Sequence, residues 1–152
     1  MKTLPGLLLA VAASLVLLLP QPACADDRAE IEAATARWID AFNRRSIDDI
    51  VALYAPDAVF LGTSSPVLRD SPALVREYFD GLKRLGPDAR QVLGEHRLKL
   101  YGDVAISSGF YALHRLQDGK ATESPARFTF VYQRRQGRWL IVSHHSSAVP
   151  TG

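Results

Sequence analysis

The chain has 152 residues, with 18 Lys and Arg against 16 Asp and Glu, so its formal net charge at pH 7 is only +2. This near balance argues against nucleic acid as a partner, because nucleic-acid-binding domains carry a strong basic excess. Hydrophobic residues make up 47% of the chain, which is enough for a substantial core.

The first 25 residues have the layout of a secretory signal peptide. Lys2 provides a positive start, residues 4–19 are almost all apolar, and the small residues Ala23-Cys24-Ala25 precede two aspartates. The apolar stretch is shorter than the ~20 residues that span a bilayer, so cleavage after Ala25 is favoured over a membrane anchor. Lipidation at Cys24 is a second alternative, but the residues before it are not led by leucine. We therefore expect a periplasmic or secreted protein without a stable membrane anchor.

Removal of residues 1–25 leaves one domain, 26–152, of about 127 residues, a common size for a single domain. The only cysteine leaves with the signal peptide. The mature chain then has no disulfide, no thiolate nucleophile and no cysteine-ligated metal.

Three helices are predicted in the first half of this domain. Apolar residues recur at helical spacing over 26–43, and Ser46 opens a short second helix that Pro56 stops. A short strand follows at 58–61. Ser71-Pro72 then begins a third helix, which Gly86-Pro87 ends.

The second half predicts antiparallel sheet, with strands at about 91–101, 104–116, 122–134 and 138–148. Turns are expected at Gly102-Asp103, Asp118-Gly119 and Gln136-Gly137. Helices followed by a run of long strands indicate an α+β fold, in which one helical layer covers one face of a curved sheet.

This order of elements, together with the segment LYAPDAVFLGT, resembles the nuclear transport factor 2-like superfamily. The segment RFTFVYQRRQGRWLIVSHHSSAVP resembles the end of the association (hub) domain of calcium/calmodulin-dependent kinase II, and also bacterial stand-alone domains of the SnoaL-like type. The resemblance covers residues 28–150. It implies a cone-shaped fold with three N-terminal helices packed on a curved, mainly antiparallel sheet.

The resemblance also implies self-association through the exposed sheet face, as a homodimer or a higher homo-oligomer. No kinase sequence is present, so we expect no kinase activity. Hub domains carry arginines in a pocket for small carboxylates, whereas this sequence places Ala112, Phe130 and Ser146 at those positions. The resemblance therefore does not carry that carboxylate site over to this chain.

Strand alternation divides the C-terminal residues between two faces. The face expected to line the pocket carries Phe110, Ala112, His114, Phe128, Phe130, Tyr132, Leu140, Val142, His144 and Ser146. The opposite face carries Tyr111, Leu113, Arg115, Arg127, Thr129, Val131, Trp139, Ile141, His145 and Ser147. A bulge in a long strand would shift this assignment.

His144 and His114 are the two histidines on the predicted pocket face, and either could act as a general base. No carboxylate shares that face to orient them, so a structural histidine is the alternative. His144 and His145 point to opposite faces of a strand and cannot both bind one ion. We therefore predict no metal site and no cofactor.

Arg127, Thr129, His145 and Ser147 form a polar network on neighbouring strands, either an anion clamp or a set of structural hydrogen bonds. The arginines around Gly137 are interpreted as a solvated turn.

The favoured function is binding of a small apolar or aromatic ligand. The residues expected to contact it are Trp38, Tyr54, Phe110, Phe130, Tyr132 and Ser146, beside His144. An isomerase or dehydratase that uses a pocket histidine, and a purely structural oligomerisation domain, are the alternatives. Whether the protein is an enzyme is left open.

Overall fold

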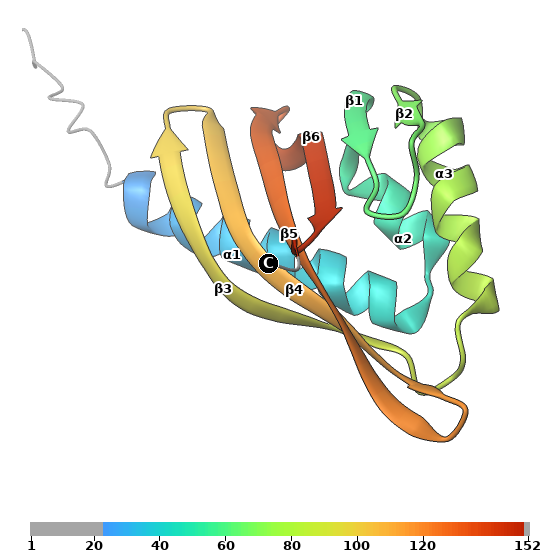
Figure 1. The fold of residues 1–152 in the computed structure, drawn as a ribbon. Coiled ribbons are helices and arrows are strands. Elements are labelled where there is room, and N and C mark those ends of the chain that lie inside the picture. The colour runs from blue at the N-terminus through green and yellow to red at the C-terminus, as the bar shows by residue number, and fades with distance from the viewer. Residues whose placement is uncertain (1–22, 151–152) are drawn as a thin grey trace, which may run out of the picture.

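The computed structural model describes residues 23–150, and most of the predicted signal peptide, residues 1–22, lies outside them. Helices come first and long strands follow, so the predicted α+β fold class is confirmed (Figure 1). The helices are α1 (Ala23–Arg44), α2 (Ile47–Ala52), α3 (Pro72–Asp80) and the 3₁₀-helix η1 (Gly81–Arg84). The strands are β1 (Tyr54–Leu61), β2 (Leu68–Arg69), β3 (Arg90–Tyr101), β4 (Val104–Gln117), β5 (Lys120–Arg135) and β6 (Arg138–Ala148).

One curved sheet carries all six strands in the order β2-β1-β6-β5-β4-β3. Figure 1 shows α1 running across one face of this sheet, α3 standing beside β1 and β2, and the β4–β5 hairpin extending past the body of the domain. We call the face that α1 covers the inner face and the opposite one the outer face. Among residues 23–150, no helix is long and apolar enough to cross a membrane.

The apolar stripe of α1 packs onto the inner face. Ile31, Ala34, Trp38 and Ala41 recur every three or four residues, and each is at most 2% exposed. The buried Thr35 of the same stripe hydrogen-bonds the hydroxyl of Tyr132 on β5, at 2.9 Å. These contacts fix the helix on the inner face of the sheet.

The first strand is longer than predicted and begins before the proline. The short helix α2 ends at Ala52, and the amide of Ile141 donates to the carbonyl of Leu53 at 2.9 Å, which draws the chain into the sheet. β1 therefore starts at Tyr54 and runs parallel to β6. Pro56 lies where the register between these strands shifts, so its missing N–H interrupts no regular ladder. The short strand β2 was not predicted.

Two features of strand pairing change the predicted assignment of faces. The pairing of β4 with β5 continues without a register shift to its last pair, Gln117 and Lys120. Each odd-numbered residue of β4 therefore pairs with an even-numbered residue of β5. Directly paired residues point to the same side of a sheet. A register shift between Val131 and Tyr132 also separates the two halves of the β5–β6 pairing.

The prediction for β4 is therefore wrong, because odd-numbered Tyr111, Leu113 and Arg115 face inward and Phe110, Ala112 and His114 face outward. In β6 the predicted faces are correct for His144 and Ser146, which follow the register shift. They are wrong before the shift, where Ile141 pairs with inward-facing Tyr132 and Trp139 is buried.

Candidate functional site

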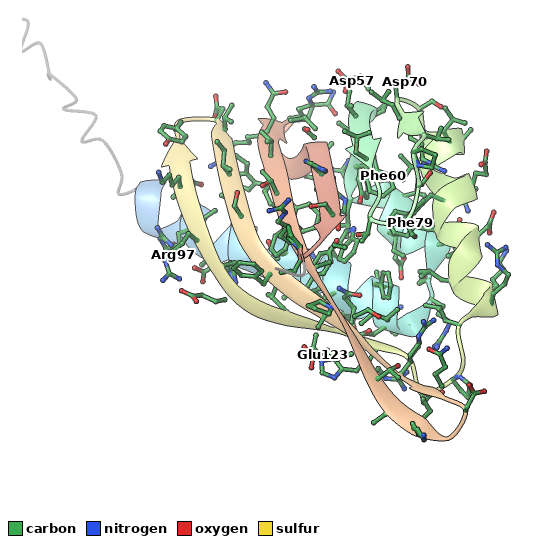
Figure 2. All side chains as sticks on the ribbon, in the orientation of Figure 1. Asp57, Phe60, Asp70, Phe79, Arg97 and Glu123 are labelled. Atoms are coloured by element: carbon green, nitrogen blue, oxygen red, sulfur yellow. The ribbon has the colours of Figure 1, made fainter. Side chains whose placement is uncertain are left out.

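A cavity of about 730 Å³ lies between the inner face of the sheet and the layer formed by α3, η1 and the β1–β2 segment. This volume is within the usual range for small-molecule sites. Its apolar wall comes from α1, β1, α3 and η1, and includes Trp38, Phe42, Phe60, Phe79 and Leu82. In Figure 2, Phe60 and Phe79 lie in the space between β1 and α3, and their rings stack with centroids 5.4 Å apart.

Trp38 stands at the centre of this aromatic wall. Its ring stacks parallel to Tyr111, with 6.0 Å between centroids and 10° between planes, and meets Phe79 edge-on at 6.0 Å. Such pairs hold their rings in fixed relative orientations. The wall is thus a largely aromatic surface whose rings hold one another in place.

A chain of buried polar groups runs behind the wall. The indole nitrogen of Trp38 donates to the hydroxyl of Tyr54 at 3.1 Å, and this hydroxyl shares a 2.7 Å hydrogen bond with His144 Nδ1. His144 is 2% exposed, and its Nε2 has no hydrogen-bond partner among the described residues. Burial, reinforced by the neighbouring His145, lowers the pKa of His144 to about 3. His144 is therefore neutral at physiological pH.

Hydroxyl groups line another part of the cavity. Tyr111 donates to Ser146 Oγ at 2.5 Å, and Ser146 also hydrogen-bonds Thr63. Burial raises the pKa of Tyr111 to about 12, so its hydroxyl keeps its proton. These groups can exchange hydrogen bonds with a polar ligand without changing charge.

Three arginines line the cavity from three different elements. They are Arg69 of β2, Arg84 of η1 and Arg115 of β4. Arg69 is 5% exposed; its Nη1 donates to Ser65 Oγ at 3.0 Å and to the carbonyl of Val67 at 2.9 Å. Within the described part of the chain, none of the three forms an ion pair, although carboxylates pair with arginines elsewhere on the surface. Among the cavity-lining residues the one carboxylate is Glu77.

Unpaired buried nitrogen atoms collect at the same place. Among the described residues, five buried side-chain polar atoms have no hydrogen-bond partner. Three of them, Arg69 Nε, Arg115 Nε and His144 Nε2, belong to residues that line the cavity. Buried polar groups are usually paired, so these three nitrogen atoms mark a part of the cavity wall whose donors are not satisfied by the described residues.

The outer face carries a shallower groove of about 440 Å³. Arg127 Nε donates to Ser147 Oγ at 2.9 Å, and the hydroxyls of Ser108 and Thr129 hydrogen-bond at 3.0 Å. His145 and the half-exposed ring of Phe110 complete the groove. The predicted polar network of Arg127, Thr129, His145 and Ser147 therefore lies together on the face away from the cavity.

Comparison with known proteins agrees with this architecture. The family model of the calcium/calmodulin-dependent protein kinase II association domain matches residues 27–150. The chain belongs to this association-domain family. The predicted resemblance to nuclear transport factor 2-like and hub domains is thereby confirmed.

Three solved structures illustrate the relationship. A Xanthomonas campestris protein named for the same association domain is 33% identical, with 88% of this chain and 95% of that chain covered and a TM-score of 0.73. A nuclear transport factor 2-like protein with a cystatin-like fold from Novosphingobium aromaticivorans is 17% identical, covers 84% and 85%, and has a TM-score of 0.76. The kinase II hub homology domain of Chlamydomonas reinhardtii is 18% identical, covers 82% and 99%, and has a TM-score of 0.71. No curated protein matches the chain.

In this association domain, the residues predicted to contact a ligand fall into three groups. Trp38, Ser146 and His144 line the cavity. Tyr54, Phe130 and Tyr132 are buried behind its wall, at most 6% exposed. Phe110 and His114 are on the outer face, because β4 has the opposite alternation, so neither reaches the cavity.

The association-domain cavity also contains residues that the sequence analysis did not assign to it. Arg69, Arg84, Arg115 and Tyr111 were missed. For β4 a usable signal was present: Asp118 and Gly119 form a two-residue turn, with φ of 53° and 74°. With a two-residue turn at this place, each odd-numbered residue of β4 pairs with an even-numbered residue of β5. Arg115 and Tyr111 therefore lie on the same face as Phe128. No comparable signal marks Arg69 or Arg84.

Proposed function

We propose that this protein is an exported, self-associating domain that binds a small organic anion with an aromatic or apolar body. Membership of the association-domain family supports an oligomerisation or ligand-binding role in general. The finer proposal rests on one observation. Arg69, Arg84 and Arg115 surround a cavity with an aromatic wall, and none of them has an ion-pair partner within the described part of the chain.

The charge around the cavity suits an anion. Three guanidinium groups and one carboxylate, Glu77, line it, so positive charge prevails. Arginine binds carboxylates through two parallel hydrogen bonds, and it does so more strongly in a site partly shielded from water. The resemblance to kinase hub domains places Ala112, Phe130 and Ser146 where those domains carry pocket arginines, and of these three only Ser146 lines the cavity here. A carboxylate site in this chain would therefore be built from different residues.

Binding is favoured over acid–base catalysis by the surroundings of His144. A catalytic histidine usually has a carboxylate partner that orients it. Here its partner is the hydroxyl of Tyr54, and burial depresses its pKa far below neutrality. His114, the other predicted base, is exposed on the outer face.

Calorimetric titration with benzoate, which joins a carboxylate to an aromatic ring, tests this proposal. We expect Arg115→Met to weaken benzoate binding about tenfold or more, because it removes a charge-assisted hydrogen bond. Arg138→Met is the matched control, because Arg138 is an exposed arginine at the start of β6 that does not line the cavity. Benzyl alcohol, which has the ring without the charge, should bind weakly to both. Equal benzoate affinity in the two variants would refute the anion site.

Self-association is proposed to use the outer face. Phe110 is 51% exposed, Leu116 57% and Val92 49%, and their strand pairing places them on this one face. Family membership makes a second copy of the chain the expected occupant. Native mass spectrometry should show an oligomer for the wild type and a monomer for Phe110→Glu. Val67→Glu, at a 49% exposed position in the β1–β2 segment, should leave the oligomer intact.

Export has a direct test. Amino-terminal sequencing of the protein recovered from the periplasm or the medium should begin at Asp26. A chain that retains Lys2, or one that carries lipid on Cys24, would refute cleavage by the predicted route.

A further inference from the structure

The hydrogen-bonded chain behind the cavity joins three elements of the fold. Trp38 comes from α1, Tyr54 from β1 and His144 from β6, and the three side chains are 1%, 6% and 2% exposed. The distances along the chain are 3.1 Å from the Trp38 nitrogen to the Tyr54 oxygen and 2.7 Å from that oxygen to His144 Nδ1. All three side chains are therefore shielded from solvent.

The direction of each bond follows from the donors available. An indole N–H can only donate, so the Tyr54 oxygen accepts from Trp38. That oxygen could also accept from an Nδ1–H, but the hydroxyl proton of Tyr54 and the Nε2 of His144 would then both lack a partner among the described residues. Donation of the hydroxyl proton to Nδ1 leaves one group fewer unpaired, so Nδ1 is assigned as the acceptor. A neutral imidazole with a lone pair on Nδ1 carries its proton on Nε2.

We infer that His144 is held as the neutral tautomer with its proton on Nε2, and that this N–H is the hydrogen-bond donor that recognises an oxygen of the cavity's ligand. The inference rests on the proposed ligand-binding function. Nε2 has no partner among the described residues, and His144 lines the cavity whereas its partner Tyr54 does not. The ring thus has one edge bonded to the protein and another edge with a donor left over.

The surroundings of the ring suit a donor rather than a base. Phe60 stacks on it at 4.8 Å, Phe130 lies at 4.3 Å and Trp38 meets it edge-on at 5.5 Å. Tyr54 and the adjacent His145 are the titratable groups beside it, and neither supplies a negative charge at neutral pH. With its proton already on Nε2, His144 cannot take one there. It assumes a donor role instead of the general-base role that the sequence suggested.

Selectivity for an acceptor follows from this arrangement. A carboxylate or carbonyl oxygen would accept a hydrogen bond from Nε2–H, whereas a methyl or ammonium group in its place would leave this donor unpaired. Nε2 is itself buried, so a ligand oxygen can reach it only if neighbouring side chains move. Tyr54 and Trp38 act through His144 and are positioning residues.

Long-range ¹H–¹⁵N correlation spectra of the histidine-labelled, ligand-free protein test the tautomer. The chain has four histidines, and His144→Gln identifies the signal of interest. We expect Nε2 protonated and Nδ1 unprotonated, unchanged between about pH 5 and pH 8. Tyr54→Phe should produce a mixture of tautomers in a protein that stays folded. A proton on Nδ1 in the wild type, or titration of His144 near neutral pH, would overturn the inference.

Benzoate affinity tests the donor role. An asparagine amide reaches the position of Nδ1 and can still accept from Tyr54, whereas a glutamine amide reaches the position of Nε2 and can still donate. We expect His144→Asn to bind benzoate about tenfold more weakly and His144→Gln to lose less. Wild-type affinity in His144→Asn overturns the donor role and leaves the proposed function standing. If the wild type itself does not bind benzoate, the proposed anion site fails, and the donor role fails with it whatever the tautomer.

Discussion

Acidification should expose the energetic consequence of burying His144 as a neutral group. Its pKa is about 3 in the folded protein, against 6.5 for the unperturbed imidazole. As the pH falls below 6.5, the unfolded chain binds a proton that the folded protein does not. The free energy of unfolding therefore decreases, by about 1.4 kcal/mol per pH unit until the folded pKa is approached. From about pH 7.5 to pH 4.5 this single group should remove about 2.5 kcal/mol of stability.

Urea unfolding of the wild type and of His144→Asn over this pH range measures the effect. Surface carboxylates titrate in both proteins, so their contribution cancels in the difference. We expect the wild type to be more stable at pH 7.5 and its advantage to shrink by about 2.5 kcal/mol at pH 4.5. Protein concentration must be constant, because self-association adds to apparent stability. A difference that does not change with pH would show that His144 is not buried and neutral, and would refute the reasoning.

Two further substitutions test packing. Thr35→Val leaves the buried hydroxyl of Tyr132 without its partner and should lower the free energy of unfolding by about 1–3 kcal/mol, measured with urea. Adding Tyr132→Phe should recover part of this loss. A double mutant whose loss is the sum of the two single losses would contradict the proposed pairing. Gly109→Ala should destabilise by about 1–3 kcal/mol, because its Cβ would lie 2.5 Å from the Cα of His96, at the register shift between β3 and β4. Gly81→Ala is the control, because the new methyl group there meets only the flexible end of Arg84. Equal midpoints of thermal unfolding for the two alanine variants would contradict this account of Gly109.

Local signals predicted much of the secondary structure. The strand boundaries 104–116 and 138–148 differ from the observed β4 and β6 by at most one residue, because Gly-containing turns flank them and alternation runs through them. Helix α3 begins at Pro72, directly after the predicted N-terminal Ser71. These signals lie within a few residues of the features they determine.

The errors arose where one strand had to be placed relative to another. Alternation shows that Tyr111 and Phe110 are on opposite faces, but which one faces inward depends on the pairing with β5. In β6 the register shift beside Tyr132 exchanges the two faces partway along the strand. Of the eight residues predicted for the pocket, three line the cavity, Trp38, His144 and Ser146. Phe110 and His114 lie on the outer face instead, and the other three are buried behind the cavity wall.

By itself, the amino-acid sequence determined the family, the turns and the order of the α-helices and of every strand except β2, because these depend on local periodicity and on recognisable segments. Only the tertiary structure decided what meets at the cavity. Arg69 and Arg115 are 46 residues apart in the chain, and Trp38 lies 106 residues before His144. Their meeting depends on the curvature of the sheet, the parallel pairing of β1 with β6 and the packing of α1 across the inner face. Contacts of such long sequence separation arise when the whole domain folds, and no short window of sequence contains them.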